Sequence, residues 1–271
     1  MTIDIIVFGA GYGGTAAIRS LQEEFGGNED VSLMWVSKDE YHFVLHESYR
    51  LIRDASVREE ITVPVEEIWD TDIEFVQGEV AGLDVDARAV ELADGETIGY
   101  DLVVVCLGSR TAFFGIDGLE NHALTLKSLD DAMAINEAVA AAGEEASEDD
   151  PAGVIVGGAG LTGIQTAGEI AAYRTERDFP MDVTLVEQAN EIFLGHDHEF
   201  QGSIRNELDD HDVEIRTGTV IGEVDDETIH TEDGKEIDYD VLVWAGGVAG
   251  QNALDSANSN KEYNRVSPAR P

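Results

Sequence analysis

Basic residues are scarce in this sequence: 16 Lys and Arg stand against 57 Asp and Glu, and the 271 residues carry a formal net charge of -41. A surface of this charge repels the phosphates of nucleic acids, which excludes a nucleic-acid-binding protein. A disordered acidic chain is the first alternative, but strand and helix patterns run through the acidic residues, and 43% of the residues are hydrophobic. We interpret the acidity as adaptation to high salt, which screens self-repulsion.

Cysteine is almost absent. The single Cys106 lies in the apolar run 102–107 and is expected to be a small buried hydrophobe. One cysteine excludes a disulfide within the chain and favours a reducing compartment. It also excludes reactions that need a redox-active pair, such as disulfide reduction or sulfide oxidation.

Long hydrophobic runs are also lacking. The longest apolar stretches have the length of a strand, well short of the ~20 residues that a membrane-spanning helix needs. No basic region precedes the apolar residues 3–8, so they are interpreted as the first strand of a domain and not as a signal peptide. We therefore expect a cytoplasmic protein without an evident membrane anchor.

Two glycine-rich turns of the same kind are present. Residues 9–14 (GAGYGG) follow the apolar run 3–8, and residues 158–163 (GAGLTG) follow 154–157. In such a turn the first glycine lets the chain leave the strand, the second lets the backbone approach a pyrophosphate, and the third lets the helix pack on the sheet. One GxGxxG alone could be only a tight strand–helix turn. The pair indicates two dinucleotides held at once.

The two halves of the chain repeat one order of elements. In each, a second strand, a short strand before a glycine, an Asp-Gly turn within a meander and a final apolar strand follow the helix. The pattern predicts an α/β fold of two Rossmann-like dinucleotide-binding domains, with parallel sheets and β-meander crossovers. The corresponding residues are 31–36 and 183–187, 73–77 and 213–217, 94–95 and 233–234, and 102–107 and 241–245.

An acidic stretch that ends in Pro151 separates the halves, after a predicted helix with Ser128 as its N-cap. The predicted organisation is a first domain over 1–139, a linker over 140–151, a second domain over 152–250 and a final segment over 251–271.

Taken together, these segments resemble the flavin-dependent pyridine nucleotide oxidoreductases, and among them most closely the type II NADH dehydrogenases. The resemblance implies FAD in the first domain, NADH in the second, hydride transfer from NADH to the flavin, and electron transfer to a quinone. The segments that carry it are 7–14, 40–43, 113–119, 126–132, 158–170 and 243–247. The cofactor-binding residues it implies are Gly9, Gly11, Gly14, Ser37, Lys38, Gly108, Gly158, Gly160, Thr162, Gly163, Gln165, Glu187 and Gly246.

Three of these positions bear on the cofactors. Glu187 ends the second strand of the second domain, where a carboxylate accepts hydrogen bonds from the adenosine ribose and repels a 2′-phosphate, so NADH is favoured over NADPH. Ser37 stands where the first domain of the family has an acid; Asp39 could substitute, or FAD binding is weaker. Gln165 stands where the family has Glu.

The end of the chain departs from the family. Residues 261–266 resemble the start of the segment that returns to the FAD domain, and we expect a truncated product without the quinone pocket or membrane anchor of its relatives, which are peripheral on the cytoplasmic face of the membrane. Two alternatives stay open beside an NADH:quinone oxidoreductase: a soluble NAD(P)H reductase with another acceptor such as ferredoxin, and an inactive remnant that binds NADH. The acceptor and a homodimer also stay open.

Other residues give weaker signals. His196 and His198 form a possible metal pair, but no third ligand is evident and no metal is predicted. His42 and His46 could lie near the flavin or only pack, and Lys127 could approach a cofactor or pair with an acid. No catalytic residue is nominated, because the cofactors carry the hydride chemistry.

Overall fold

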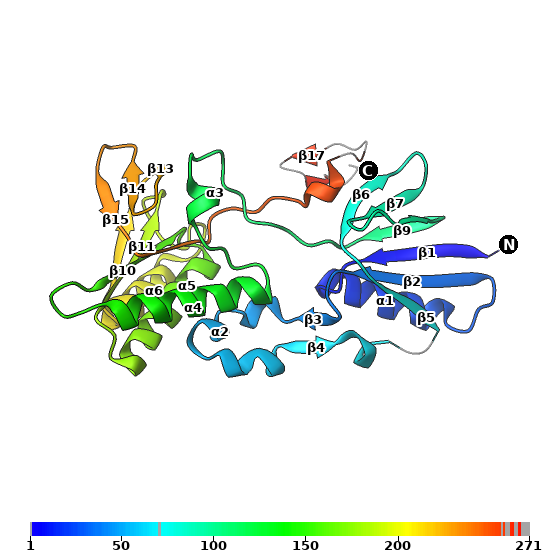
Figure 1. Ribbon diagram of the computed structural model, residues 1–271, viewed down its shortest axis with the longest axis horizontal. Coiled ribbons are helices and arrows are strands. Elements are labelled where there is room, and N and C mark those ends of the chain that lie inside the picture. The colour runs from blue at the N-terminus through cyan, green and yellow to red at the C-terminus, as the bar shows by residue number, and fades with distance from the viewer. Residues whose placement is uncertain (1, 70–71, 256, 258–260, 263–264, 267–271) are drawn as a thin grey trace. The chain divides into compact units, whose positions relative to one another are not determined.

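The computed structural model describes residues 2–69, 72–255, 257, 261–262 and 265–266. The chain forms two compact units, drawn in Figure 1. The first comprises Met1–Val44, Glu59–Arg110 and Ala249–Pro271, and the second comprises Leu45–Arg58 and Thr111–Val248.

The first unit is built on a parallel sheet of strand order β5-β2-β1-β9. Alternate residues of β1 serve its two faces: Ile5 and Val7 pack with α1, while Ile6 and Phe8 pack with the meander β6-β7-β8. Its elements are β1 (Ile3–Phe8), α1 (Tyr12–Phe25), β2 (Val31–Ser37), β3 (Tyr41–Phe43), β4 (Thr62–Pro64), η3 (Val65–Glu67), β5 (Ile73–Gln77), β6 (Val80–Asp84), β7 (Ala89–Leu92), β8 (Thr97–Gly99), β9 (Leu102–Val105), η4 (Asn252–Leu254), β17 (Lys261–Glu262) and β18 (Arg265–Val266).

The second unit repeats this plan with the strand order β12-β11-β10-β16 and the meander β13-β14-β15. One core cluster joins the meander to the sheet, from Ile229 on β14 to Ile155 on β10. Its elements are η1 (Leu45–Glu47), α2 (Arg50–Arg53), α3 (Leu119–His122), α4 (Leu129–Glu145), β10 (Ala152–Gly157), α5 (Leu161–Arg177), β11 (Met181–Glu187), α6 (His198–Asp210), β12 (Val213–Thr217), β13 (Ile221–Val224), β14 (Thr228–Thr231), β15 (Glu236–Asp238) and β16 (Val241–Trp244), and η2 (Ala55–Glu60) crosses between the units.

When the strands of each sheet are numbered in chain order, both sheets have the order 3-2-1-4, which matches the first four positions of the Rossmann order 3-2-1-4-5-6. Both are parallel, and in each an antiparallel meander lies in the chain between the third and fourth strands, so the predicted fold class and the internal repeat are confirmed. Because helices and a meander cover the two faces, the inner strands are nearly all apolar, as parallel strands require.

The final strands of the two repeats differ in burial. All four residues of β16 are buried, whereas Leu102 on β9 is 56% exposed. β16 has a further neighbour, because Leu124 pairs with Val243 in parallel; among the described residues β9 lies at the edge of its sheet. The prediction of a buried Cys106 is therefore wrong in degree, since this residue is only half-buried.

The boundary between the halves also differs from the sequence prediction. Helix α4 continues to Glu145, into the stretch expected to be a linker, because the alanine-rich run at 138–142 favours a helix. The compact units divide at Arg110 and Val248 and not at 139 and 250, since the chain after Thr111 packs on the second sheet. Part of the final segment 251–271 lies outside the described residues.

Candidate functional site

The first glycine turn leaves the carboxyl end of β1 and opens α1. Gly9 has a φ of +89°, a conformation that side chains disfavour. A Cβ on Gly14 would lie 1.7 Å from the Gly9 carbonyl oxygen, so only glycine allows the helix to start this close to the strand. A Cβ on Gly11 would meet no described atom within 4 Å, which leaves this side of the turn open to a ligand.

The second turn has the same construction. Gly158 has a φ of +99°, and a Cβ on Gly163 would lie 1.8 Å from the Gly158 carbonyl oxygen. Gly160 is again open within the part of the chain that the structure describes. Two turns that close in the same way at the carboxyl edges of two parallel sheets fit a pyrophosphate each, because helix N-termini there direct N–H groups and a partial positive charge at the anion.

Glu187 is fixed at the second turn. Its Oε2 accepts a hydrogen bond from the Ala159 N–H at 2.7 Å, and its Oε1 accepts one from the Ala189 N–H at 2.8 Å. Each carboxylate oxygen retains a lone pair, so the group can still accept hydrogen bonds from a ribose. The sequence predicted the carboxylate at this place; it did not predict these backbone partners.

Ser37 occupies the equivalent place in the first unit and makes a weaker contact. It is the last residue of β2, is buried, and accepts a hydrogen bond from the Asp39 N–H at 3.4 Å. Lys38 follows, and its carbonyl accepts a hydrogen bond from Gln77. The residue that ends β2 is therefore a serine, whereas the residue that ends β11 is Glu187 with its two backbone hydrogen bonds.

The remaining predicted positions lie at the same two edges. Gly108, with a φ of +71°, follows β9 in the first unit. Thr162 and Gln165 lie in α5, and Gly246 follows β16 in the second unit. A Cβ on Gly246 would meet the Trp244 ring at 2.4 Å, so this backbone position also excludes a side chain. The predicted residues thus gather at one edge within each unit, while their roles stay predictions.

The structure also gives the surroundings of the residues whose sequence signals were weaker. The His196 ring stacks on Phe193 at 3.7 Å, and His198 shares a hydrogen bond with Gln201 at 2.9 Å. Burial lowers the pKa of the Lys127 ammonium. Burial raises the pKa of the Cys106 thiol, so this thiol is a poor nucleophile. The described residues contain no group of three or more His, Cys, Asp or Glu side chains able to hold a metal ion.

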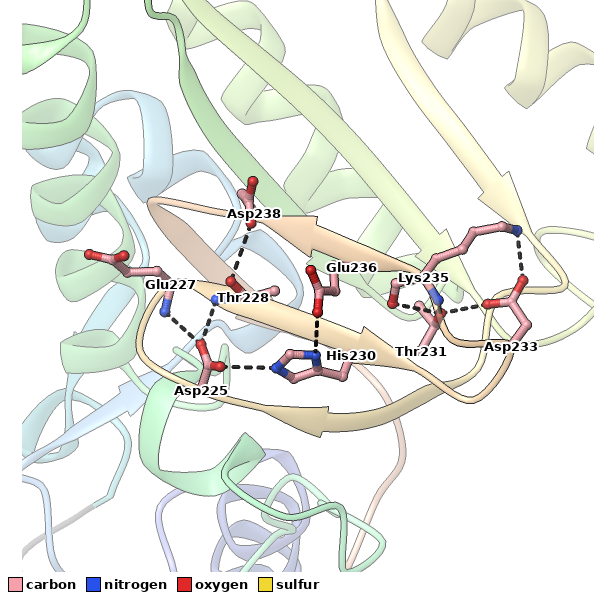
Figure 2. Close-up of polar contacts among 9 residues, drawn as sticks. All are labelled: Asp225, Glu227, Thr228, His230, Thr231, Asp233, Lys235, Glu236 and Asp238. Atoms are coloured by element: carbon pink, nitrogen blue, oxygen red, sulfur yellow. Dashed lines mark hydrogen bonds and ion pairs between the residues drawn. The ribbon is translucent and has the colours of Figure 1, made fainter.

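A network of polar contacts joins side chains on and beside the meander β13-β14-β15 of the second unit (Figure 2). His230 lies 2.9 Å from Asp225 and 3.7 Å from Glu236. The hydrogen bond to Asp225 raises the pKa of His230, and the same bond lowers the pKa of Asp225. Asp225 also accepts from the Thr228 N–H at 2.8 Å, so the network ties the strand to its turn.

Within the described ranges, the helices are all too short or too polar to cross a bilayer.

The paired sheets and turns define a two-dinucleotide-binding flavoprotein fold. The chain belongs to the pyridine nucleotide-disulphide oxidoreductase family, whose sequence profile matches residues 3–266. FAD and NADH, the cofactors predicted from the sequence, are typical of the family and of its type II NADH dehydrogenases.

Three similar proteins illustrate the match. The type II NADH:quinone oxidoreductase of Staphylococcus aureus (strain NCTC 8325 / PS 47) is 27% identical over 97% of this chain and 69% of that protein. The structure of NDH2 from Plasmodium falciparum in complex with NADH superposes with a TM-score of 0.84 at 16% identity, over 94% of this chain and 57% of that one. A ferredoxin reductase from Rhodopseudomonas palustris gives 0.78 at 18% identity, over 96% and 63%.

Proposed function

We propose that this chain is an FAD-dependent NADH dehydrogenase that passes a hydride from NADH to the flavin and electrons on to a quinone. The observation that carries the proposal is the pair of glycine turns, closed by Gly14 on Gly9 and by Gly163 on Gly158. Similarity to a type II NADH:quinone oxidoreductase along 97% of the chain supports the acceptor.

In this proposal the chain's own residues bind and orient. The open faces at Gly11 and Gly160 admit the pyrophosphates of FAD and NADH, and Glu187 accepts the adenosine ribose hydroxyls of NADH. Bound FAD supplies the hydride acceptor and the two-electron store, so the hydride step needs no side-chain acid or base. Gln165, which follows the second turn, is uncharged, whereas the resemblance implies a Glu at this position.

A second candidate function is the binding of NADH without FAD. Ser37 ends β2 with a hydroxyl, whereas Glu187 ends β11 with a carboxylate that accepts from the Ala159 N–H, which favours NADH as the tighter ligand. A reductase with a protein acceptor such as ferredoxin has support only from the fold, which it shares with the ferredoxin reductase above.

The test is the visible spectrum of the chain purified in high salt, before and after NADH. A flavin band that NADH bleaches without oxygen, and that a short-chain quinone restores, is the expected result. A band restored by ferredoxin and not by quinone would replace the proposed acceptor. A colourless protein that takes up no added FAD but binds NADH would replace the proposal with the second candidate.

A further inference from the structure

His42 connects a neighbouring strand to the first glycine turn. It comes from β3, and its side chain is buried, with 8% of the residue exposed. Its Nδ1 lies 2.7 Å from the Ala10 carbonyl oxygen, in the middle of the turn. The Thr15 hydroxyl lies 3.4 Å from the same nitrogen, too long to compete with this short contact.

The partner fixes the tautomer. A carbonyl oxygen has no proton, so Nδ1 must carry the hydrogen and donate it. Tyr12 packs against the imidazole in an edge-to-face arrangement, with the ring centroids 4.8 Å apart and the planes at 80°. This contact restricts rotation of the ring and keeps Nδ1 directed at Ala10.

A second ring donor holds the preceding carbonyl. Trp35 on β2 donates from Nε1 to the Gly9 carbonyl oxygen at 2.9 Å. The carbonyl oxygens of Gly9 and Ala10, which are successive in the turn, thus each accept a hydrogen bond from a ring nitrogen of the protein. Helix α1 starts at Tyr12, and its N-cap, Gly11, has no side chain that could cap the first N–H groups. Trp35 and His42 thus add side-chain hydrogen bonds to the backbone bond from the Gly9 N–H to the Val36 carbonyl, just before the helical N–H groups that would face a phosphate.

In the second turn, different groups form hydrogen bonds to the corresponding backbone atoms. There the Ala159 carbonyl accepts from the Phe193 backbone N–H at 2.8 Å, and the Ala159 N–H is bound by Glu187. The first turn has Ser37 in place of that carboxylate. A side chain, His42, replaces the backbone donor.

We propose that His42 is a positioning residue for the flavin: its Nδ1–H holds the Ala10 carbonyl and so keeps the first turn in the shape that receives the pyrophosphate. The inference rests on the proposed function, because that function assigns FAD to this turn. Trp35 shares the role but is completely buried in the core, so its replacement would confound folding with binding.

The test uses two amides that differ in reach. The amide nitrogen of Asn takes the place of Nδ1, whereas that of Gln takes the place of Nε2. We expect His42→Gln to weaken FAD binding by about tenfold, the effect of losing a hydrogen bond to a buried carbonyl, and His42→Asn to retain most of the affinity. His46→Gln is the matched control, since His46 lies four positions further along and its side chain is 65% exposed.

The dissociation constant of FAD is measured by quenching of flavin fluorescence, and that of NADH is measured on each variant as a check of the second unit. Loss of affinity in His42→Gln with rescue in His42→Asn supports the positioning role. Equal FAD affinity in both variants and the wild type overturns it, as does equal loss in both with the melting temperature unchanged. If the wild type itself takes up no FAD, the proposed function fails first, and the two failures are distinguished.

Discussion

At the scale of single residues, we predict that Glu187 selects NADH over NADPH. A 2′-phosphate would be placed beside a carboxylate that two backbone N–H groups hold in position. We predict that the protein binds NADH at least about tenfold more tightly than NADPH and that Glu187→Ala brings the two affinities close together. Fluorescence titration with each nucleotide measures the ratio. The variant also leaves the Ala159 and Ala189 N–H groups without their acceptor, which should lower the free energy of unfolding by about 1–3 kcal/mol.

Asp240, which directly precedes β16, provides the control, because its carboxylate accepts from the Gly153 N–H near the start of β10 at 2.7 Å. Asp240→Ala should destabilise the fold in the same manner while leaving the ratio of NADH to NADPH affinity unchanged. If it shifted this ratio as far as Glu187→Ala does, the assignment of Glu187 to the ribose would be wrong.

At the scale of elements, helix α5 contains two glycines with opposite requirements. A Cβ on Gly163 would lie 1.8 Å from the Gly158 carbonyl oxygen, whereas one on Gly168 meets no described atom within 4 Å. Gly163→Ala must push the helix off the strand, so we predict loss of measurable NADH binding and a lower melting temperature. Gly168→Ala should raise the free energy of unfolding by about 0.5–1 kcal/mol, because alanine costs less backbone entropy in a helix. Calorimetry and NADH titration on both variants check the pair, and a change of the same sign in both would contradict it.

The elements also show how far the sequence predicts the structure. Strand, turn and helix follow from local patterns, and so does the Ser128 N-cap, whose hydroxyl accepts from the Asp131 N–H at 3.0 Å. The exposure of β9 was not predictable, because burial of an apolar run depends on which strand lies beside it. The same holds for the bond from Nδ1 of His42 to Ala10, which joins residues that are 32 positions apart. The pattern of residue types identifies a glycine turn; its partners are set by tertiary contacts.

A segment remote in sequence can also join the second unit, as α2 does. Leu51 and Ile52 on α2 are completely buried, and Arg53 forms an ion pair with Glu169 on α5 at 2.8 Å. Burial raises the pKa of Glu169, and Arg53 opposes that shift. The short apolar stretch that forms α2 resembles many others, so nothing local in it indicates which helix it packs against.

At the scale of the whole molecule, the net charge of -41 dominates the response to solvent. Self-repulsion among exposed carboxylates acts over about 10 Å at 0.1 M salt and over about 3 Å at 1 M. We predict that the melting temperature rises steadily between 0.1 and 2 M KCl, by about 2–4 °C for each kcal/mol of repulsion removed. Calorimetry in KCl measures the change, and sucrose at matched osmolality is the control, because it is excluded from protein surfaces without screening charge. A melting temperature independent of KCl, or raised equally by sucrose, would mean that the acidic surface does not limit stability. In that case the interpretation of this composition as adaptation to high salt would be wrong, while the fold and its two glycine turns would be unaffected.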